Sequence, residues 1–71
     1  MTISQFVISR RRTRHLTQRG LAERAGVSAE YIRKLELDQI TNPTVSTLVA
    51  LAAALSVAPS ELLQYFTKET P

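Results

Sequence analysis

The side chains best suited to chemistry in this 71-residue chain are the basic ones, which lie mostly in its first half. Eight of the nine Lys and Arg residues fall within residues 1–34, against two of the six acidic residues. The remainder is therefore net negative, although the whole chain carries a formal charge of +3. A charge distribution polarised in this way suits a polyanionic partner. A solvated basic helix without a partner is the alternative interpretation of the charge alone.

Residue types that support catalysis are sparse and poorly spaced. The chain has no cysteine and a single histidine, His15, and its carboxylates lie singly. Without a Gly-rich phosphate loop or a cluster of metal ligands, we expect no enzyme activity, no metal site and no cofactor. The longest apolar run, 48–55, is far shorter than the roughly 20 residues that cross a bilayer. We therefore expect a cytoplasmic protein with no membrane partner, since no signal-peptide pattern is present either.

Helical periodicity recurs along the chain, and no segment of useful length alternates as a strand does. So small a chain needs efficient helix packing for stability. We expect helices from 3 to near 14, over 18–25 and 28–37, from 44 or 45 onward, and from Pro59, as an all-α, five-helix single domain over 1–71. The expected inward-facing residues are Ile3, Phe6, Val7, Leu21, Ala22, Ala25, Ile32, Leu35, Leu48, Leu51, Ala52, Leu55, Leu62, Leu63 and Phe66.

The second and third expected helices are separated only by Gly26 and Val27. Thr17 and Ser28 are good N-cap residues, and Gly26 suits the left-handed end of a helix. Such spacing predicts a helix-turn-helix unit over 17–37, in which a small-residue turn sets the second helix at a steep angle. In these units the first turn of the second helix enters the major groove of DNA.

A set of spaced matches gives the chain a specific resemblance over residues 3–66. It reads Leu16-Thr17-Gln18-x-x-Leu21-Ala22-x-x-Ala25-Gly26-Val27-Ser28, then Tyr31-Ile32, Leu35-Glu36, Asn42-Pro43, Leu48, Leu51-Ala52 and Leu55-x-Val57. The pattern resembles the Xre/Cro-type DNA-binding domain of phage lambda-type repressors. This resemblance implies a lambda repressor-like fold, two-fold dimers on double-stranded DNA, and transcriptional control.

The resemblance also implies roles for individual residues. The expected base-contacting residues are Ser28, Ala29, Glu30, Arg33 and Lys34. The expected phosphate-contacting residues are Gln18, Tyr31, Thr41, Asn42 and Thr44, with packing against the turn as the alternative for Tyr31, and Gln18 is also expected to brace the recognition helix. Arg10 and Arg19 are expected to contact phosphate as well, because of their charge rather than because of the resemblance. Arg33 and Lys34 can donate to guanine, while Glu30 can accept from cytosine or hold an arginine in place. Arg11 and Glu36 are expected to form a structural ion pair, with a phosphate contact by Arg11 as the alternative.

The chain departs from the family pattern at four positions. Gly20 replaces the residue that would complete a capping box with Thr17. His15 and Asp38 stand where the family has glycine, so both are expected in turns, and His15 in the left-handed region. Ala58 takes the place of a serine cap before Pro59. These changes affect expected stability rather than the expected fold.

We expect a sequence-specific transcriptional regulator that binds a palindromic operator as a homodimer, with half-sites about 34 Å apart. A protein-interaction module, such as an antitoxin that neutralises a partner protein, is the alternative. The expected dimer or partner surface consists of Leu37, Ile40, Tyr65 and Phe66, although Ile40 has packing against the core as an alternative. With no room for a sensor domain, regulation would follow concentration, unless the chain belongs to a longer regulator.

Overall fold

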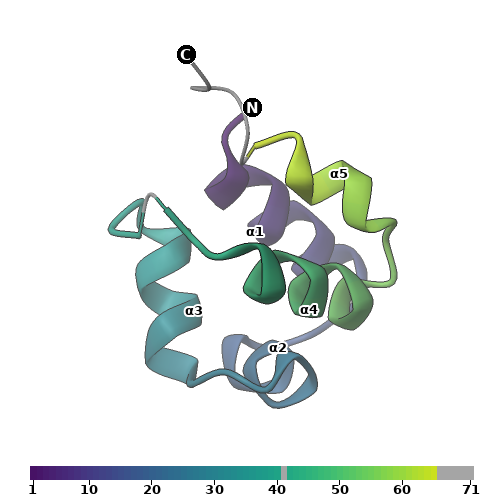
Figure 1. Cartoon of the computed structure of the whole chain (residues 1–71). Helices are drawn as coiled ribbons and strands as arrows, with labels where there is room; N and C mark the ends of the chain where they lie inside the picture. The colour runs from purple at the N-terminus through teal and green to yellow at the C-terminus, as the bar shows by residue number, and fades with distance from the viewer. Residues whose placement is uncertain (41, 66–71) are drawn as a thin grey trace.

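The structure, a computed structural model, describes residues 1–40 and 42–65. This part of the chain forms five α-helices and no strand, which confirms the all-α prediction (Figure 1). The helices are α1 (Ile3–Thr13), α2 (Gln18–Ala25), α3 (Ala29–Glu36), α4 (Val45–Leu55) and α5 (Pro59–Leu63). Their bounds agree with the expected ones to within one or two residues.

Side chains of Thr and Ser fix where most of the helices begin. Thr17, Ser28 and Thr44 each accept a hydrogen bond from the backbone N–H three residues later. Each such bond satisfies one of the backbone donors that a helix leaves unpaired at its N-terminus. At α1, Thr2 and Gln5 form a full capping box, a signal that the sequence analysis overlooked.

Left-handed residues end the helices and turn the chain. Gly26 has a φ of 74°, and His15 and Asp38, which replace family glycines, have φ of 57° and 62°. Ser56 also lies in this region, with a φ of 60°, at the C-cap of α4, and this was not expected. Three side chains therefore occupy a conformation that glycine adopts more readily, at some cost in stability.

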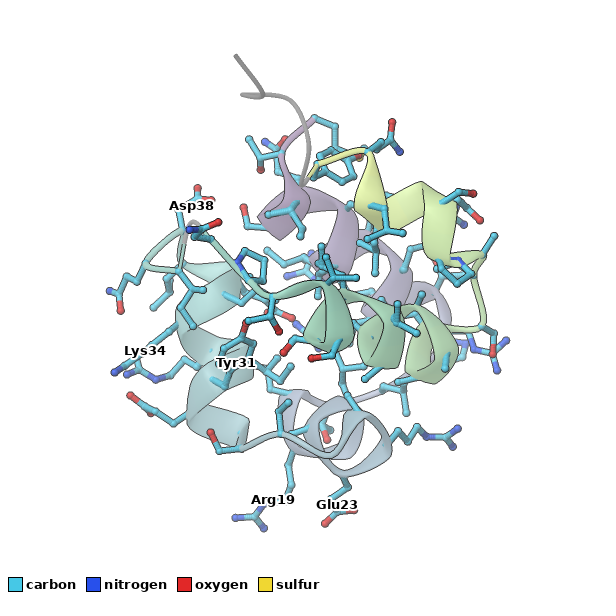
Figure 2. All side chains as sticks on the ribbon, in the orientation of Figure 1. Arg19, Glu23, Tyr31, Lys34 and Asp38 are labelled. Atoms are coloured by element: carbon cyan, nitrogen blue, oxygen red, sulfur yellow. The ribbon has the colours of Figure 1, made fainter. Side chains whose placement is uncertain are left out.

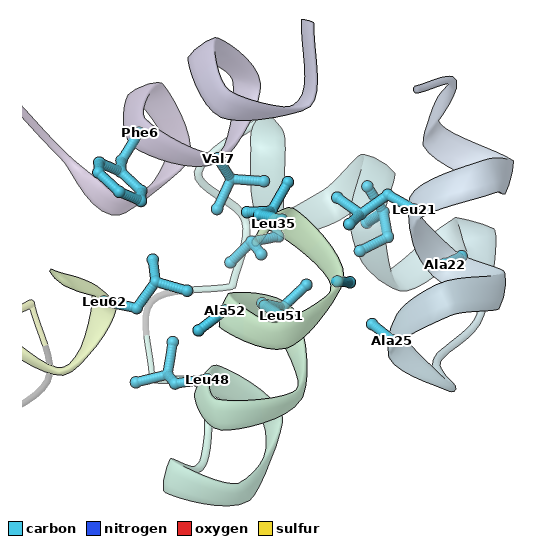
Figure 3. Close-up of a cluster of buried hydrophobic side chains, with 13 residues drawn as sticks. Phe6, Val7, Leu21, Ala22, Ala25, Leu35, Leu48, Leu51, Ala52 and Leu62 are labelled. Atoms are coloured by element: carbon cyan, nitrogen blue, oxygen red, sulfur yellow. The ribbon is translucent and has the colours of Figure 1, made fainter. Parts of the chain in front are cut away.

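The hydrophobic core surrounds α4, which packs between α2 on one side and α5 on the other (Figure 3). The next helix, α3, packs against α2 and also against α1. Fully buried leucine, isoleucine and valine side chains come from all five helices: Val7, Leu21, Ile32, Leu35, Leu48, Leu51, Leu55 and Leu62. All eight were expected on inward faces. Two of these side chains, Ile32 and Leu35, belong to α3, and their burial away from water is the main contribution that holds α3 against the other helices.

The core differs from the expected one at its edges. Ile3 and Leu63 are only partly buried, whereas Ser4 and Ala54 are buried and were not expected to be. The Ser4 hydroxyl lies 2.9 Å from the Thr2 hydroxyl, so a polar group is buried there with a partner. Phe66, which was also expected in the core, lies outside the described residues.

Candidate nucleic-acid interface

The corner between α2 and α3 is built from a three-residue turn. Gly26 ends α2 in the left-handed conformation, and the next amide, of Val27, donates 3.0 Å to the Ala22 carbonyl. Val27 packs on the core, and the Ser28 hydroxyl then accepts from the Tyr31 amide at 3.0 Å to open α3. The corner directs α3 steeply across α2, as a helix-turn-helix unit requires (Figure 1).

One face of α3 is buried and the opposite face is open. Ile32 and Leu35 are fully buried, and their positions fix the rotation of the helix about its axis. All five expected base-contacting residues are exposed: Ser28, Ala29, Glu30, Arg33 and Lys34. Figure 2 shows Lys34 pointing away from the body of the protein. The structure thus brings these five together on the first two turns of α3 and at its cap.

Within this open face, Glu30 pairs with both basic residues. Arg33 donates from Nε to Oε1 at 3.1 Å and from Nη2 to Oε2 at 2.6 Å. The Lys34 ammonium lies 3.8 Å from the same Oε2. The hydrogen bond from Arg33 lowers the pKa of Glu30 from its ordinary value, and the same bond raises the pKa of Arg33. Glu30 is therefore ionised at neutral pH.

A second carboxylate, that of Glu36 at the end of α3, is nearly buried and joins three helices. It accepts from Arg11 Nε at 2.6 Å, from Arg11 Nη2 at 3.0 Å and from Gln18 Nε2 at 2.9 Å. Arg11 also donates to the Leu16 carbonyl at 2.9 Å, which ties down the segment between α1 and α2. Every partner in this cluster is hydrogen-bonded, and bidentate pairs of this kind fix geometry as well as charge. We call Arg11, Gln18 and Glu36 the bracing cluster.

The expected phosphate-contacting residues lie at several places. Arg19 is exposed on α2 and points outward (Figure 2). Asn42 is exposed, and the side chain of Thr44 caps α4. Tyr31 is half-buried beside the core, and this burial raises the pKa of its phenol, with the Thr47 side chain acting in the opposite direction. Thr41 lies outside the described residues.

Arg10 is placed differently from the other expected phosphate contacts. Its guanidinium carbon lies 5.4 Å from the centre of the Phe6 ring, and its Nη2 lies 3.8 Å from Glu61 of α5. A cation over an aromatic ring is attracted by the ring's electron distribution. Arg10 therefore links α1 to α5 and is not gathered with the exposed residues of α3. The spacing of Phe6 and Arg10, four residues apart on one helix, was the signal for this contact.

The residues of the expected partner surface differ in how far they are exposed. The Leu37 side chain is exposed, but Ile40 and Tyr65 pack partly against the core. The Tyr65 ring lies 5.8 Å from the Phe6 ring, centre to centre. For Ile40, the structure thus supports the alternative of packing on the core. Phe66 lies outside the described residues, as noted above.

Two exposed apolar residues of α4 escaped the sequence analysis. The side chains of Val45 and Val49 are partly exposed to solvent. Because they lie four residues apart on one helix, they share a face. Their spacing would have revealed this face, since it sets them apart from the inward-facing leucines of the same helix.

Two further kinds of site were sought in the described residues, a metal site and a membrane-spanning helix. Residues 1–40 and 42–65 contain no group of three His, Asp or Glu side chains placed to hold a metal ion. None of the helices in that part is long and apolar enough to span a bilayer.

The amino-acid sequence is similar to those of known helix-turn-helix proteins. A helix-turn-helix family model matches residues 7–62. The chain is 41% identical over 63 residues to an immunity repressor protein of Bacillus phage phi105, an alignment that covers 89% of this chain and 43% of the repressor. It is 46% identical over 61 residues to an uncharacterized HTH-type transcriptional regulator of Sinorhizobium fredii, covering 86% and 77% of the two chains. The chain thus spans less than half the length of the phage repressor.

Solved structures with the same fold include two DNA-binding proteins. The biofilm master regulator SinR, solved in complex with DNA, superposes with a TM-score of 0.82 at 32% identity, covering 87% of this chain and 98% of that one. The DNA-binding domain of the P22 c2 repressor gives a TM-score of 0.80 at 27% identity, covering 89% and 82%. The chain therefore belongs to the Xre/Cro-type helix-turn-helix family, a non-enzymatic family of DNA-binding transcriptional regulators.

Proposed function

We propose that the chain binds a palindromic operator as a homodimer and regulates transcription from the promoter beside it. One observation carries this proposal: donors and acceptors of α3 are exposed on a helix whose other face is locked into the core. A helix presented in this way fits the major groove, where each base pair offers a distinct pattern of donors and acceptors. The SinR structure, which contains DNA, supports the same use of the fold.

The proposal divides the exposed residues by role. Arg33 and Lys34 face guanine edges, Glu30 lies beside them, and the small side chains of Ser28 and Ala29 allow the helix to approach the bases. The backbone contacts are assigned to Gln18, Arg19, Tyr31, Asn42 and Thr44, together with Thr41. Contacts to phosphate fix the position of the protein on the duplex, while contacts to base edges supply the sequence preference.

The bracing cluster has a distinct part in this proposal. Arg11, Gln18 and Glu36 connect α1, α2 and the end of α3 through hydrogen bonds of 2.6 to 3.0 Å. A recognition helix has to be held within a fraction of an ångström for its hydrogen bonds to discriminate between bases. We therefore assign Arg11 to the fold, and Gln18 to both the cluster and the phosphate backbone.

The proposal includes a homodimer because a second copy doubles the protein surface that can contact DNA. A single small module buries roughly 600–1,000 Å² on DNA, and two-fold dimers read two half-sites about 34 Å apart. Exposed apolar side chains are available for contact with a second copy, namely Leu37, Val45 and Val49. The half-buried Ile40 and Tyr65 border the core rather than standing free.

A salt titration with matched variants tests the proposal. Affinity for a duplex should fall steeply with salt, by about 0.9 logarithmic units per unit of log salt for each phosphate contact. Arg19→Ala should reduce this slope by the amount that corresponds to about one phosphate contact, whichever duplex sequence is used. Lys34→Ala should instead change the base preference. An unchanged slope in Arg19→Ala together with an unchanged base preference in Lys34→Ala would refute the proposal. A stoichiometric protein complex whose formation is indifferent to DNA would refute it as well and favour a protein-interaction module.

A further inference from the structure

The open face of α3 carries one acidic residue, Glu30, between the exposed side chains that could read bases. Its carboxylate is occupied on both oxygens, because Arg33 Nε bonds Oε1 and Arg33 Nη2 bonds Oε2. The Lys34 ammonium approaches Oε2 as well. Each hydrogen bond from Arg33 uses one of the two lone-pair sites of its oxygen, and together the two bonds turn the carboxylate toward Arg33.

The same pairing divides the donors of Arg33. A guanidinium has five N–H donors in a planar fork, and Glu30 takes one edge of it, formed by Nε and Nη2. The other edge, formed by Nη1 and the second hydrogen of Nη2, is left for another partner. Two parallel donors on one edge match the O6 and N7 acceptors of a guanine in the major groove. The side chain of Arg33 is 47% exposed, and its contact with Glu30 involves only the Nε and Nη2 edge.

We propose that Glu30 is a positioning residue, which holds Arg33 so that its Nη1/Nη2 edge reads one guanine in each half-site. This inference rests on the proposed function and refines it, because Glu30 itself then reads no base. It predicts a G·C pair opposite Arg33 and no separate requirement for cytosine opposite Glu30.

Holding Arg33 in advance has a measurable consequence. Immobilising a long side chain on binding weakens a complex roughly 2- to 10-fold, and a side chain already held avoids much of this loss. Glu30 has a second effect of opposite sign, since its negative charge on the DNA-facing side repels phosphates. Removing Glu30 should therefore lower the preference for guanine and raise the affinity for unrelated sequences.

The test compares the bases that wild-type protein and variants select from a randomised duplex pool. Glu30→Ala should reduce the preference for one guanine roughly 2- to 10-fold and strengthen binding to unrelated duplex. Glu30→Gln keeps one acceptor, so its preference for the guanine should lie between those of wild-type protein and Glu30→Ala. Arg33→Ala should abolish the preference at that same position. Glu23→Ala is the matched control, because it removes the same charge from an exposed position on α2 and leaves the pair intact (Figure 2). It should leave every base preference unchanged.

Three results of this selection would overturn the inference while leaving sequence-specific DNA binding in place. They are an unchanged guanine preference in Glu30→Ala, a preference lost at a different position from that of Arg33→Ala, or no loss in Arg33→Ala. Nuclear magnetic resonance adds a test without DNA, since the Arg33 Nε–H signal should shift between wild type and Glu30→Ala. An unmoved signal would show that the pair does not form. If wild-type protein binds no duplex at all, the proposed function fails and this inference falls with it.

Discussion

Replacing Glu36 with alanine tests the physical account of how α3 is held. The Glu36 side chain is only 5% exposed, and that of Arg11, its ion-pair partner, is 14% exposed. Alanine would leave the Arg11 guanidinium with its bond to the Leu16 carbonyl and no opposite charge. It would also remove the acceptor of the Gln18 amide. The change therefore strands a positive charge and a polar group in a region with little water.

The size of the effect follows from the burial of the pair. Removing one partner of a buried ion pair costs about 3–5 kcal/mol. We take about 3 kcal/mol, because Arg11 keeps its carbonyl partner and some exposure. A domain of this length has a free energy of unfolding of roughly 4–10 kcal/mol, so the loss is a large part of the total. The melting temperature should fall by more than about 10 °C.

Circular dichroism during thermal and urea unfolding measures this loss. Glu23→Ala, an exposed change on α2, should alter the free energy of unfolding by no more than about 0.5 kcal/mol. The double variant Arg11→Met, Glu36→Leu should recover part of the stability, because it removes the unpaired charge but still leaves the Gln18 amide without its acceptor. A loss below about 1 kcal/mol in Glu36→Ala, or strictly additive effects in the double variant, would refute the reasoning.

Three further predictions concern α3 and the end of α4. Lys34→Ala should weaken binding to the preferred duplex by about 1–3 kcal/mol and relax discrimination at one or two base pairs, and an unchanged preference in a competition assay would remove Lys34 from base readout. Ser56→Gly should raise the free energy of unfolding by about 0.5–1 kcal/mol, because the φ of 60° favours glycine, and urea unfolding that shows a loss would contradict the strain argument. The hydrogen bond from Arg33 holds the pKa of Glu30 below its ordinary value, so the pair's contribution to stability is present above the unfolded pKa and is lost as the pH falls through the folded one. A carbon NMR titration of the Glu30 carboxyl should therefore show a midpoint that rises in Arg33→Ala, and a midpoint that is the same in both proteins would contradict the pairing.

The fold was predictable from the sequence because its signals are local. The spacing of Leu48, Leu51 and Leu55 follows the helical period, and Thr17 and Ser28 are caps whose role depends on nearby backbone amides. The left-handed conformation of His15 and the turn at Asp38 followed from the resemblance to a family that has glycine at both positions, whereas the left-handed conformation of Asp38 was not predicted. Ser56 gave no such signal, since serine is common both in turns with a negative φ and in other loops, and its presence does not indicate a left-handed conformation.

Contacts between distant parts of the chain were harder to predict. The carboxylate of Glu36 meets Gln18 from 18 residues away, and only the family pattern suggested that Gln18 braces α3. Arg10 was assigned to phosphate from its charge, but it lies over the ring of Phe6, because the packing of α5 on the same side places Glu61 within reach. Charge in a sequence indicates the sign of a surface, whereas the direction of each side chain depends on the packed helices.

The most direct test of the account is selection from a randomised duplex pool at two salt concentrations, followed by sequencing of the bound duplexes. We predict enrichment of a two-fold symmetric site whose half-sites lie about 34 Å apart, with affinity that falls steeply as salt rises. Each half-site should contain the G·C pair assigned to Arg33. Binding that enriches no symmetric site, or that does not weaken with salt, would contradict the proposal of a dimeric, sequence-reading regulator.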